Sequence, residues 1–173
     1  DQFSIFVDSI VKGGSITYNE EDAEVKRVVE ASENTIRKLP YQTPEYTVEN
    51  GQTLLETPEG PLPIEVFGAH NLNNLAGAKW ICQHMGIDED DVYEAIATFK
   101  GASKRLEKIA ESKTSVAYKD FAHSPSKVEA TTKAVKEQYE NRTLVACLEL
   151  HTYSSLNAAF LKEYKGALDA ADV

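Results

Sequence analysis

The sequence lacks a long hydrophobic run and contains only two cysteines. No window approaches the roughly 20 apolar residues that a membrane-spanning helix requires, so no membrane partner is expected. The N-terminal stretch DQFSIFVDSI is acidic and amphipathic, unlike a signal peptide. Cys82 and Cys147 lie in apolar patterns without metal-ligand spacing. We therefore expect two reduced core residues in a cytoplasmic protein.

Basic residues are also scarce. The 173 residues include 18 Lys and Arg against 28 Asp and Glu, which gives a net charge of −10. The cations are scattered along the chain, so no nucleic-acid partner is expected. An acidic protein can still bind an anionic ligand, because helix N-termini and a few well-placed cations act locally. The hydrophobic fraction of 42% suits one ordinary domain or parts of two.

Common catalytic signatures are missing too. The phosphate-loop pattern G-x-x-x-x-G-K-[ST], a Cys/His cluster for zinc and a serine in a nucleophile elbow do not occur. The sequence alone therefore predicts no catalytic residue and no metal ligand. The acidic run from Asp88 to Asp91 is best explained by helix capping and solvation, with metal binding as the minor alternative.

The first part of the chain combines helical and strand-like patterns. The runs EYTVEN, GQTLLETPEG and PLPIEVFG are separated by Asn-Gly and Glu-Gly turns, which predicts a small antiparallel sheet. A helix that starts at Asp88 is expected to turn four apolar residues inward: Val92, Ala95, Ile96 and Phe99. The other elements predicted here are helices over residues 2–12, 19–38 and 71–86, and a strand over residues 15–19.

After Gly101 the pattern changes to alternating strands and helices. Strands are predicted over residues 115–121 and 143–150, and helices over residues 125–139 and 156–168. The run from Leu144 to Leu148 is apolar on both faces, as is typical of a buried parallel strand. We therefore predict an α/β fold in which a β-α-β-α wind begins here, with a domain boundary near residue 103.

The stretch GAHNLNNLAGA, residues 68–78, places several polar side chains where a helix should begin. His70, Asn71 and Asn74 are spaced to face one way at the electropositive end of that helix. An Asn side chain offers a donor and an acceptor together, which matches an adenine edge. The alternative is that Asn71 is only the N-cap and the others are surface residues, and the spacing alone does not decide between the two.

Polar side chains also follow the two strands predicted in the second part. Asp120 and His123 follow the first strand, and Glu149, His151 and Ser154 follow the second. In open α/β sheets, ligands collect at the carboxyl ends of parallel strands. A carboxylate there can accept from a ribose hydroxyl or hold a cation, and an imidazole can donate to a phosphate or carboxylate. A well-capped helix start and an ordinary solvated loop are the structural alternatives, and both stay open.

Taken together, these segments resemble the Mur ligase family. The family pattern is G-x-H-N-x-x-N, F-x-G-x-x-R-R, D-Y/F-A-H-x-P and P-H-x-Y-S/T, and this chain has GAHNLNN, FKGASKRLE, DFAHSPSKV and LELHTYSSL in the same order. The resemblance covers roughly residues 62–173 well and the first 60 weakly. It implies the end of a central, ATP-binding domain over residues 1–103, then the first half of a Rossmann-like C-terminal ligase domain over residues 104–173.

The resemblance implies an ATP-dependent ligase of the peptidoglycan cell wall. Such enzymes join amino acids or peptides to UDP-N-acetylmuramate through an acyl phosphate, with Mg²⁺ between the ATP phosphates. The phosphate loop, main magnesium ligands and modified lysine of the family would lie upstream, so this chain alone is expected to be inactive. The implied contacts with ATP involve His70, Asn71, Asn74, Arg105 and Asp120, and those with the substrates involve His123, Glu149, His151 and Ser154.

The acceptor substrate is not fixed by the motifs. VFGAHN, RLE, DFAH and Glu149 look most like the murein peptide ligases, which recycle the tripeptide L-alanyl-γ-D-glutamyl-meso-diaminopimelate. The L-alanine-adding ligases usually carry DYGHHP, and Arg where this chain has Thr152 and Ser155. His151 is more like the L-alanine-adding group. An L-alanine ligase, a folylpolyglutamate synthetase-like relative and a non-catalytic nucleotide-binding module therefore stay as alternatives.

Overall fold

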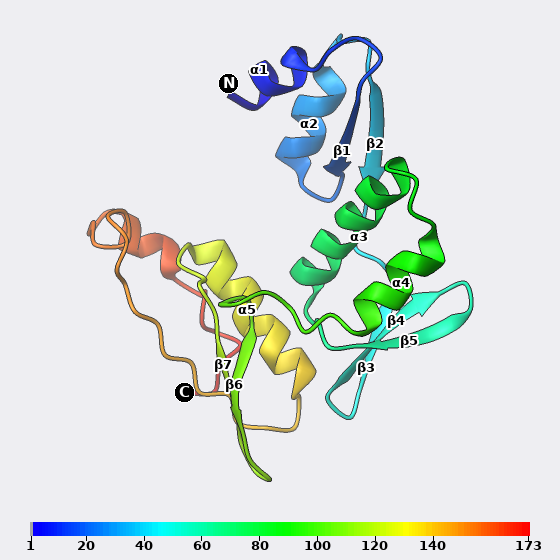
Figure 1. Cartoon of the computed structure of the whole chain (residues 1–173). Coiled ribbons are helices and arrows are strands. Elements are labelled where there is room, and N and C mark those ends of the chain that lie inside the picture. Colours follow the sequence, from blue (N-terminus) through cyan, green and yellow to red (C-terminus); the bar gives the residue numbers. More distant parts are fainter. Residues whose placement is uncertain (1) are drawn as a thin grey trace. The chain divides into compact units, whose positions relative to one another are not determined.

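The computed structural model describes residues 2–173 and has a mixed α/β fold, as predicted (Figure 1). The chain divides into two compact units. The first unit consists of the chain up to Glu45 together with His70–Ile96, and the second of Tyr46–Ala69 together with Ala97–Val173. Over the described residues, no helix combines the length and the apolar character that crossing a bilayer would require.

The first unit is built on two parallel strands and the helices beside them. β1 (Ser15–Asn19) pairs with β2 (Arg37–Tyr41) in parallel. The helices α1 (Gln2–Ser9) and α2 (Ala23–Ala31) precede and connect these strands. The buried core here consists of Val7, Tyr18, Val28 and Val29.

The helix predicted over residues 19–38 is wrong at both ends. α2 begins only after Asp22, whose carboxylate accepts hydrogen bonds from the backbone N–H groups of Glu24 and Val25. It ends at Ala31, and the segment that reaches Pro40 is the strand β2. Gly13 and Gly14 exchange backbone hydrogen bonds with Thr35 and Arg37, so pairing with β1 outweighs the helical pattern of this segment.

α3 (Ala69–His84) and α4 (Glu89–Ala97) complete the first unit. α3 buries Leu72, Leu75, Ala76 and Gly77. α4 starts directly after Asp88, as predicted, but none of its residues is buried. The inward face predicted for α4 is therefore wrong: Ala95 and Phe99 are exposed, and Val92 and Ile96 are only half-buried. Instead, α4 is tied to α3 by Lys79, which contacts Glu89 and Tyr93.

The second unit contains the predicted antiparallel sheet. β3 (Tyr46–Glu49), β4 (Gln52–Thr57) and β5 (Gly60–Ile64) lie in the order β3-β4-β5. Asn50 and Gly51 have φ values of 52° and 78°, the left-handed conformation that a two-residue hairpin turn requires. The alternation along β4 places Thr53 and Leu55 inside.

The rest of the second unit differs from the predicted β-α-β-α wind. The strand predicted over residues 115–121 is β7 (Val116–Lys119), and it pairs antiparallel with β6 (Glu107–Glu111), which the sequence did not reveal. The predicted helix over residues 125–139 is confirmed as α5 (Pro125–Gln138). The predicted helix over residues 156–168 is wrong apart from one 3₁₀ turn, Phe160–Tyr164.

The predicted buried strand over residues 143–150 is also wrong. Among the described residues, backbone partners of this segment come only from the C-terminal end: Asp172 and Val173 bond to Leu144, and Ala146 bonds to Val173. A parallel strand buried on both faces needs neighbouring strands, which these few bonds do not supply. Val145 is consequently exposed. Both cysteines are free, but Cys147 is exposed and Cys82 only half-buried, so neither is the core residue predicted.

A buried polar link joins the sheet of the second unit to α5. The Thr53 hydroxyl donates to Gln138 Oε1 at 2.9 Å, and Gln138 Nε2 donates to the carbonyl of Gly51 at 2.6 Å. Thr53 is fully buried and Gln138 is 7% exposed. Each polar atom in this link therefore has a partner in place of water.

Replacement of Gln138 should destabilise the second unit. In Gln138→Ala the buried Thr53 hydroxyl loses its acceptor, and we expect a loss of about 1–3 kcal/mol in the free energy of unfolding. Amide hydrogen exchange in β4 measures this loss. The matched control is Glu140→Ala, an exposed change just beyond α5 that should shift stability by less than about 0.5 kcal/mol. Equal exchange rates in the two variants would contradict the prediction.

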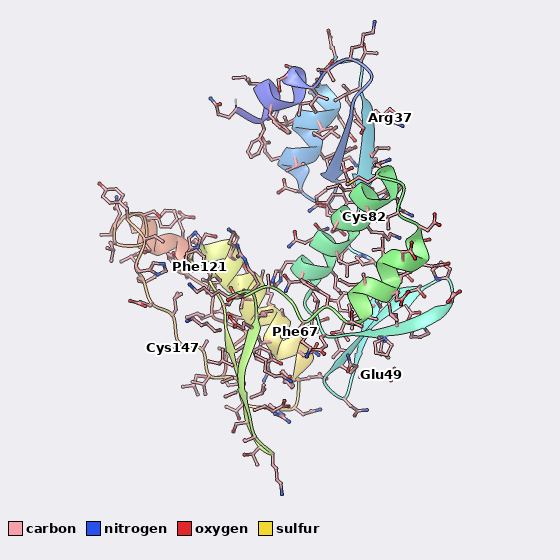
Figure 2. All side chains as sticks on the ribbon, viewed as in Figure 1. Arg37, Glu49, Phe67, Cys82, Phe121 and Cys147 are labelled. Carbon is pink, nitrogen blue, oxygen red and sulfur yellow. The ribbon has the colours of Figure 1, made fainter. Side chains whose placement is uncertain are left out.

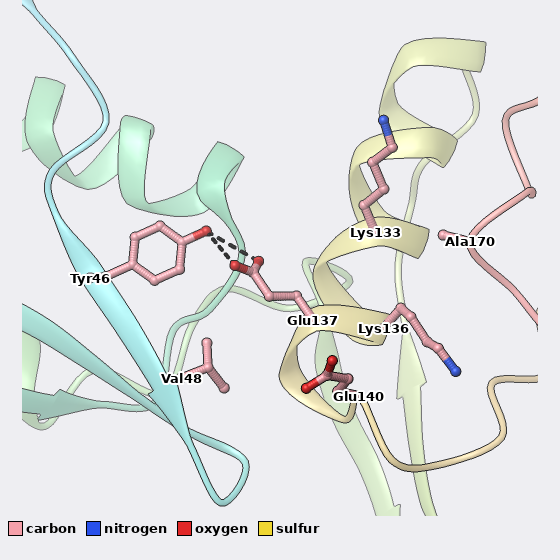
Figure 3. Close-up of a pocket in the computed structure, with 7 residues that line it drawn as sticks. All are labelled: Tyr46, Val48, Lys133, Lys136, Glu137, Glu140 and Ala170. Atoms are coloured by element: carbon pink, nitrogen blue, oxygen red, sulfur yellow. Dashed lines mark hydrogen bonds between the residues drawn. The ribbon is translucent and has the colours of Figure 1, made fainter.

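A second link connects β3 to α5 (Figure 3). The Tyr46 hydroxyl donates to the carboxylate of Glu137, at 2.9 and 3.1 Å from its two oxygens. Partial burial, followed by the hydrogen bond and charge of Glu137, raises the pKa of Tyr46 to about 12. The protonated phenol is thus favoured in the folded state.

This shift predicts a loss of stability at high pH. Because the folded pKa is raised, the contribution of Tyr46 is complete below about pH 10, the unfolded value, and is lost as the pH rises toward about 12. Ultraviolet titration of the tyrosines should show this late ionisation, and Tyr46→Phe should abolish it. Glu137→Gln should lower the pKa of Tyr46 without restoring the ordinary value, because burial is the larger cause. A Tyr46 pKa unchanged by Glu137→Gln would refute the Glu137 contribution.

Candidate functional site

The first group of predicted site residues lies at the start of α3, in the first unit. His70 and Asn71 are half-buried in the first turn of the helix, and Asn74 is exposed in the next turn. The N-terminal turns of a helix carry partial positive charge, which favours an electron-rich ligand. Asn74 is accordingly placed with its amide open to solvent at this end of the helix.

The neighbouring Asn73 has a structural task that the sequence did not reveal. Its side-chain amide donates to Glu21 at 2.9 Å, to Thr43 at 3.1 Å and to Asn19 at 3.3 Å. Glu21 also accepts from the backbone N–H and the hydroxyl of Thr43. Asn73 therefore fastens α3 to the segments that follow β1 and β2, and leaves Asn74 on the exposed side of the helix.

A second group surrounds Arg105 in the loop before β6. Lys104 and Leu106, on either side of Arg105, have φ values of 56° and 47°. A non-glycine residue in this left-handed region costs roughly 1–2 kcal/mol, so the loop must be held by its surroundings. Leu106 is buried with Phe67 and Ala134, which anchors one side of the loop in the core of the second unit.

Asp120 lies between this loop and α5. One of its carboxylate oxygens accepts from the backbone N–H of Leu106 at 2.8 Å. The other accepts from the backbone N–H of Ala122 at 2.6 Å and from the Thr131 hydroxyl at 3.4 Å. The structure therefore brings Asp120 and the Arg105 loop together. Each carboxylate oxygen has two lone pairs, so the oxygen that Leu106 contacts can still accept from one more donor.

Glu107 holds the same loop from the other side. Its carboxylate accepts from the backbone N–H of Lys104 at 2.8 Å and from the Ser103 hydroxyl at 3.0 Å. The N–H of Lys104, and then the Ser103 hydroxyl, hold the pKa of Glu107 below its ordinary value. No spacing rule marked this residue in the sequence, since the contact depends on the left-handed turn.

The two predicted histidines lie next to Phe121, the residue labelled in Figure 2, and next to each other. The ring centroids of His123 and His151 are 6.4 Å apart, and Phe121 is 5.0 and 5.8 Å from them. Nδ1 of His123 lies 2.9 Å from the carbonyl of Phe121, and Nδ1 of His151 lies 3.2 Å from the carbonyl of Glu149. A carbonyl only accepts, so we assign a hydrogen to Nδ1 in both rings.

The loop after His151 is a self-bonded turn. The buried Ser155 donates to the carbonyl of Thr152 and accepts from its N–H, whereas Ser154 is exposed. The Glu149 side chain is also exposed. Between Arg142 and Lys162 the sequence has no cation. The structure thus brings His123 and His151 together, whereas no contact joins the Glu149 or Ser154 side chain to them among the described residues.

A shallow pocket elsewhere in the second unit contains none of the predicted site residues (Figure 3). Three of its four charged side chains have partners within the chain: Lys133 pairs with Glu129, Lys136 with Asp172, and Glu137 accepts from Tyr46. The fourth is the exposed Glu140. These interactions leave little unbalanced charge for a ligand. The lining residues are Tyr46, Val48, Lys133, Lys136, Glu137, Glu140 and Ala170.

Sequence comparisons connect the chain to ligases. No protein-family model matches it. The UDP-N-acetylmuramate–L-alanine ligase of Lactococcus lactis subsp. cremoris is 34% identical over 115 residues, which cover 65% of this chain and 25% of that protein. The ligase of the same name from a Sulfurihydrogenibium species is 27% identical and covers 99% of this chain and 39% of that protein. The chain thus spans about a quarter to two fifths of these relatives.

Solved structures share the fold. A complex of FPGS with AMPPCP and folate superposes with a TM-score of 0.69 at 18% identity, covering 95% of this chain and 43% of that one. A UDP-N-acetylmuramoyl-L-alanyl-D-glutamate–2,6-diaminopimelate ligase superposes with a TM-score of 0.54 at 18% identity, covering 91% and 35%. The chain is therefore similar in sequence to UDP-N-acetylmuramate–L-alanine ligases and shares the fold of these two solved proteins.

Proposed function

We propose that this chain is part of an ATP-dependent ligase that joins an amino acid or peptide to UDP-N-acetylmuramate in the cytoplasm. The observation that carries the proposal is the alignment of 65% of the chain with a UDP-N-acetylmuramate–L-alanine ligase. The residues resembling the family motifs also lie on defined supports, namely the start of α3, the Arg105 loop and the loops around Phe121. The domain boundary near residue 103 is part of the same proposal.

In this proposal, the chain contributes binding and positioning. Asn74 reads the adenine edge from the start of α3, with His70 and Asn71 ordering that turn. Arg105 and Asp120 contact the adenosine moiety. His123, Glu149, His151 and Ser154 face the acceptor or the muramyl carboxylate. Such contacts favour the attack of the acceptor amine on an acyl phosphate by fixing the reacting groups in place.

The names of the relatives favour L-alanine as the acceptor. A specific observation favours the murein tripeptide as the second candidate. The loop with Thr152 and Ser155 has no cation to meet the carboxylate of a small amino acid, and Ser155 is buried in a turn contact. The exposed Glu149 can pair with an ammonium group, which the diaminopimelate end of the tripeptide supplies.

In this proposal, Mg²⁺ accompanies the phosphates of ATP, as the resemblance to the family implies. Among residues 2–173, no three His, Cys, Asp or Glu residues lie close enough together to hold a metal ion. The ATP-dependent activity is proposed for the complete polypeptide, and the 173-residue chain by itself is expected to be inactive.

Phosphate release tests the function directly. The complete polypeptide would be given ATP, Mg²⁺ and UDP-N-acetylmuramate with either L-alanine or the tripeptide, and the 173-residue chain would be run in parallel. Release with L-alanine from the complete polypeptide supports the first candidate, and release only with tripeptide supports the second. No release with either acceptor, together with retained ATP binding, would favour a non-catalytic nucleotide-binding module.

The assignment of Asn74 has its own test. Asn74→Ala in the complete polypeptide should weaken ATP binding by about 1–3 kcal/mol, because adenine polar groups lose their partner. Calorimetric titration with a non-hydrolysable ATP analogue measures the change. Glu149→Ala serves as the comparison and should raise the KM for the acceptor more than that for ATP. Unchanged nucleotide affinity in Asn74→Ala would remove Asn74 from the site.

A further inference from the structure

The loop that carries Arg105 is held in a backbone conformation that its own residues disfavour. Lys104 and Leu106 have φ values of 56° and 47°, in the region that favours glycine. Neither position is glycine, so the conformation persists only because neighbouring groups fix it. Arg105, between them, is thereby given one direction in which its side chain can leave the backbone.

Two carboxylates fix the amide groups on either side of Arg105. Glu107 accepts from the N–H of Lys104 at 2.8 Å, and Asp120 accepts from the N–H of Leu106 at 2.8 Å. The carbonyl of Lys104 in turn accepts from the N–H of Phe121 at 3.0 Å. Charge-assisted bonds of this kind are stronger than neutral ones, so the pair can hold a disfavoured loop.

The guanidinium that this loop presents is exposed and has no hydrogen bond or ion pair to any other part of the described chain. A cation on a fixed support loses less conformational freedom on binding than one on a mobile loop. We infer that Glu107 and Asp120 are positioning residues that hold Arg105 ready for the nucleotide. This inference rests on the proposed function of Arg105 toward ATP.

If Glu107 had only a structural role, its loss would lower the thermal stability of the protein and would not act selectively on the KM for ATP. The Glu107 carboxylate lies at the surface, where such contacts add little to folding stability. Its loss should therefore appear in the KM for ATP and leave both the thermal midpoint and the KM for the acceptor nearly unchanged. Glu107 is the better residue to test, because Asp120 is itself proposed to contact the nucleotide.

The experiment is a double-mutant cycle in the complete polypeptide with Glu107→Ala, Arg105→Ala and both changes together. Glu107→Ala should raise the KM for ATP about tenfold, and should have no further effect once Arg105 is alanine, because it acts through Arg105. The matched control is Glu111→Ala on the same strand. Glu111 pairs with Lys108 at 2.8 Å and bonds no amide of the loop, so the KM for ATP should not change.

Each other outcome has a definite meaning. Additive effects of the two changes, or equal losses for ATP and the acceptor, would overturn the positioning role while leaving the proposed function intact. A wild-type polypeptide without ATP-dependent activity would overturn the proposed function and this inference with it. An unaltered KM for ATP in Arg105→Ala, in an otherwise active enzyme, would overturn the inference and the assignment of Arg105 together.

Discussion

The carboxylate of Asp120 is the contact on which the proposed site in the second unit depends most. Its two oxygens bond to Leu106, Ala122 and Thr131, and thus join the loop before β6, the turn after β7 and helix α5. The same turn carries Phe121, against which His123 and His151 pack. The side chain of Asp120 therefore positions three segments that are separate in the sequence. A ribose contact by Asp120, as proposed, would add to this arrangement without replacing it, because lone pairs remain.

The start of α3 shows how neighbouring asparagines are given different tasks. The side-chain amide of Asn73 donates hydrogen bonds to Asn19, Glu21 and Thr43. Asn74, one residue later, is rotated by about 100° around the helix axis and is exposed. The contacts of Asn73 anchor the start of α3 to the segments next to β1 and β2. An adenine contact by Asn74, as proposed, would benefit from such a fixed support.

Local sequence signals predicted several elements of the fold correctly. The errors arose where pairing between distant segments of the chain decided the structure. The Asn50–Gly51 turn set the β3–β4 hairpin, and the helix predicted over residues 125–139 is α5. By contrast, the segment around Pro40 became a strand because β1 lies beside it. Residues 143–150 formed no strand because, within the described part of the chain, their backbone–backbone hydrogen bonds reach only Asp172 and Val173. The site followed the same rule. The motifs identified the His123 and His151 candidates, but only the folded structure revealed Phe121 beside them and Glu107 beside the Arg105 loop.

The backbone strain beside Arg105 is tolerated because the strained residue Leu106 also packs in the core. Glycine at position 106 would relieve the left-handed φ of 47°, but it would also delete the side chain that packs with Phe67 and Ala134. Burial of a leucine contributes roughly 1.5–3 kcal/mol, which is at least as large as the strain of about 1–2 kcal/mol. The loop therefore keeps a strained leucine because its core contact outweighs the backbone cost. The direction of Arg105 follows from that balance together with the two carboxylates that complete it.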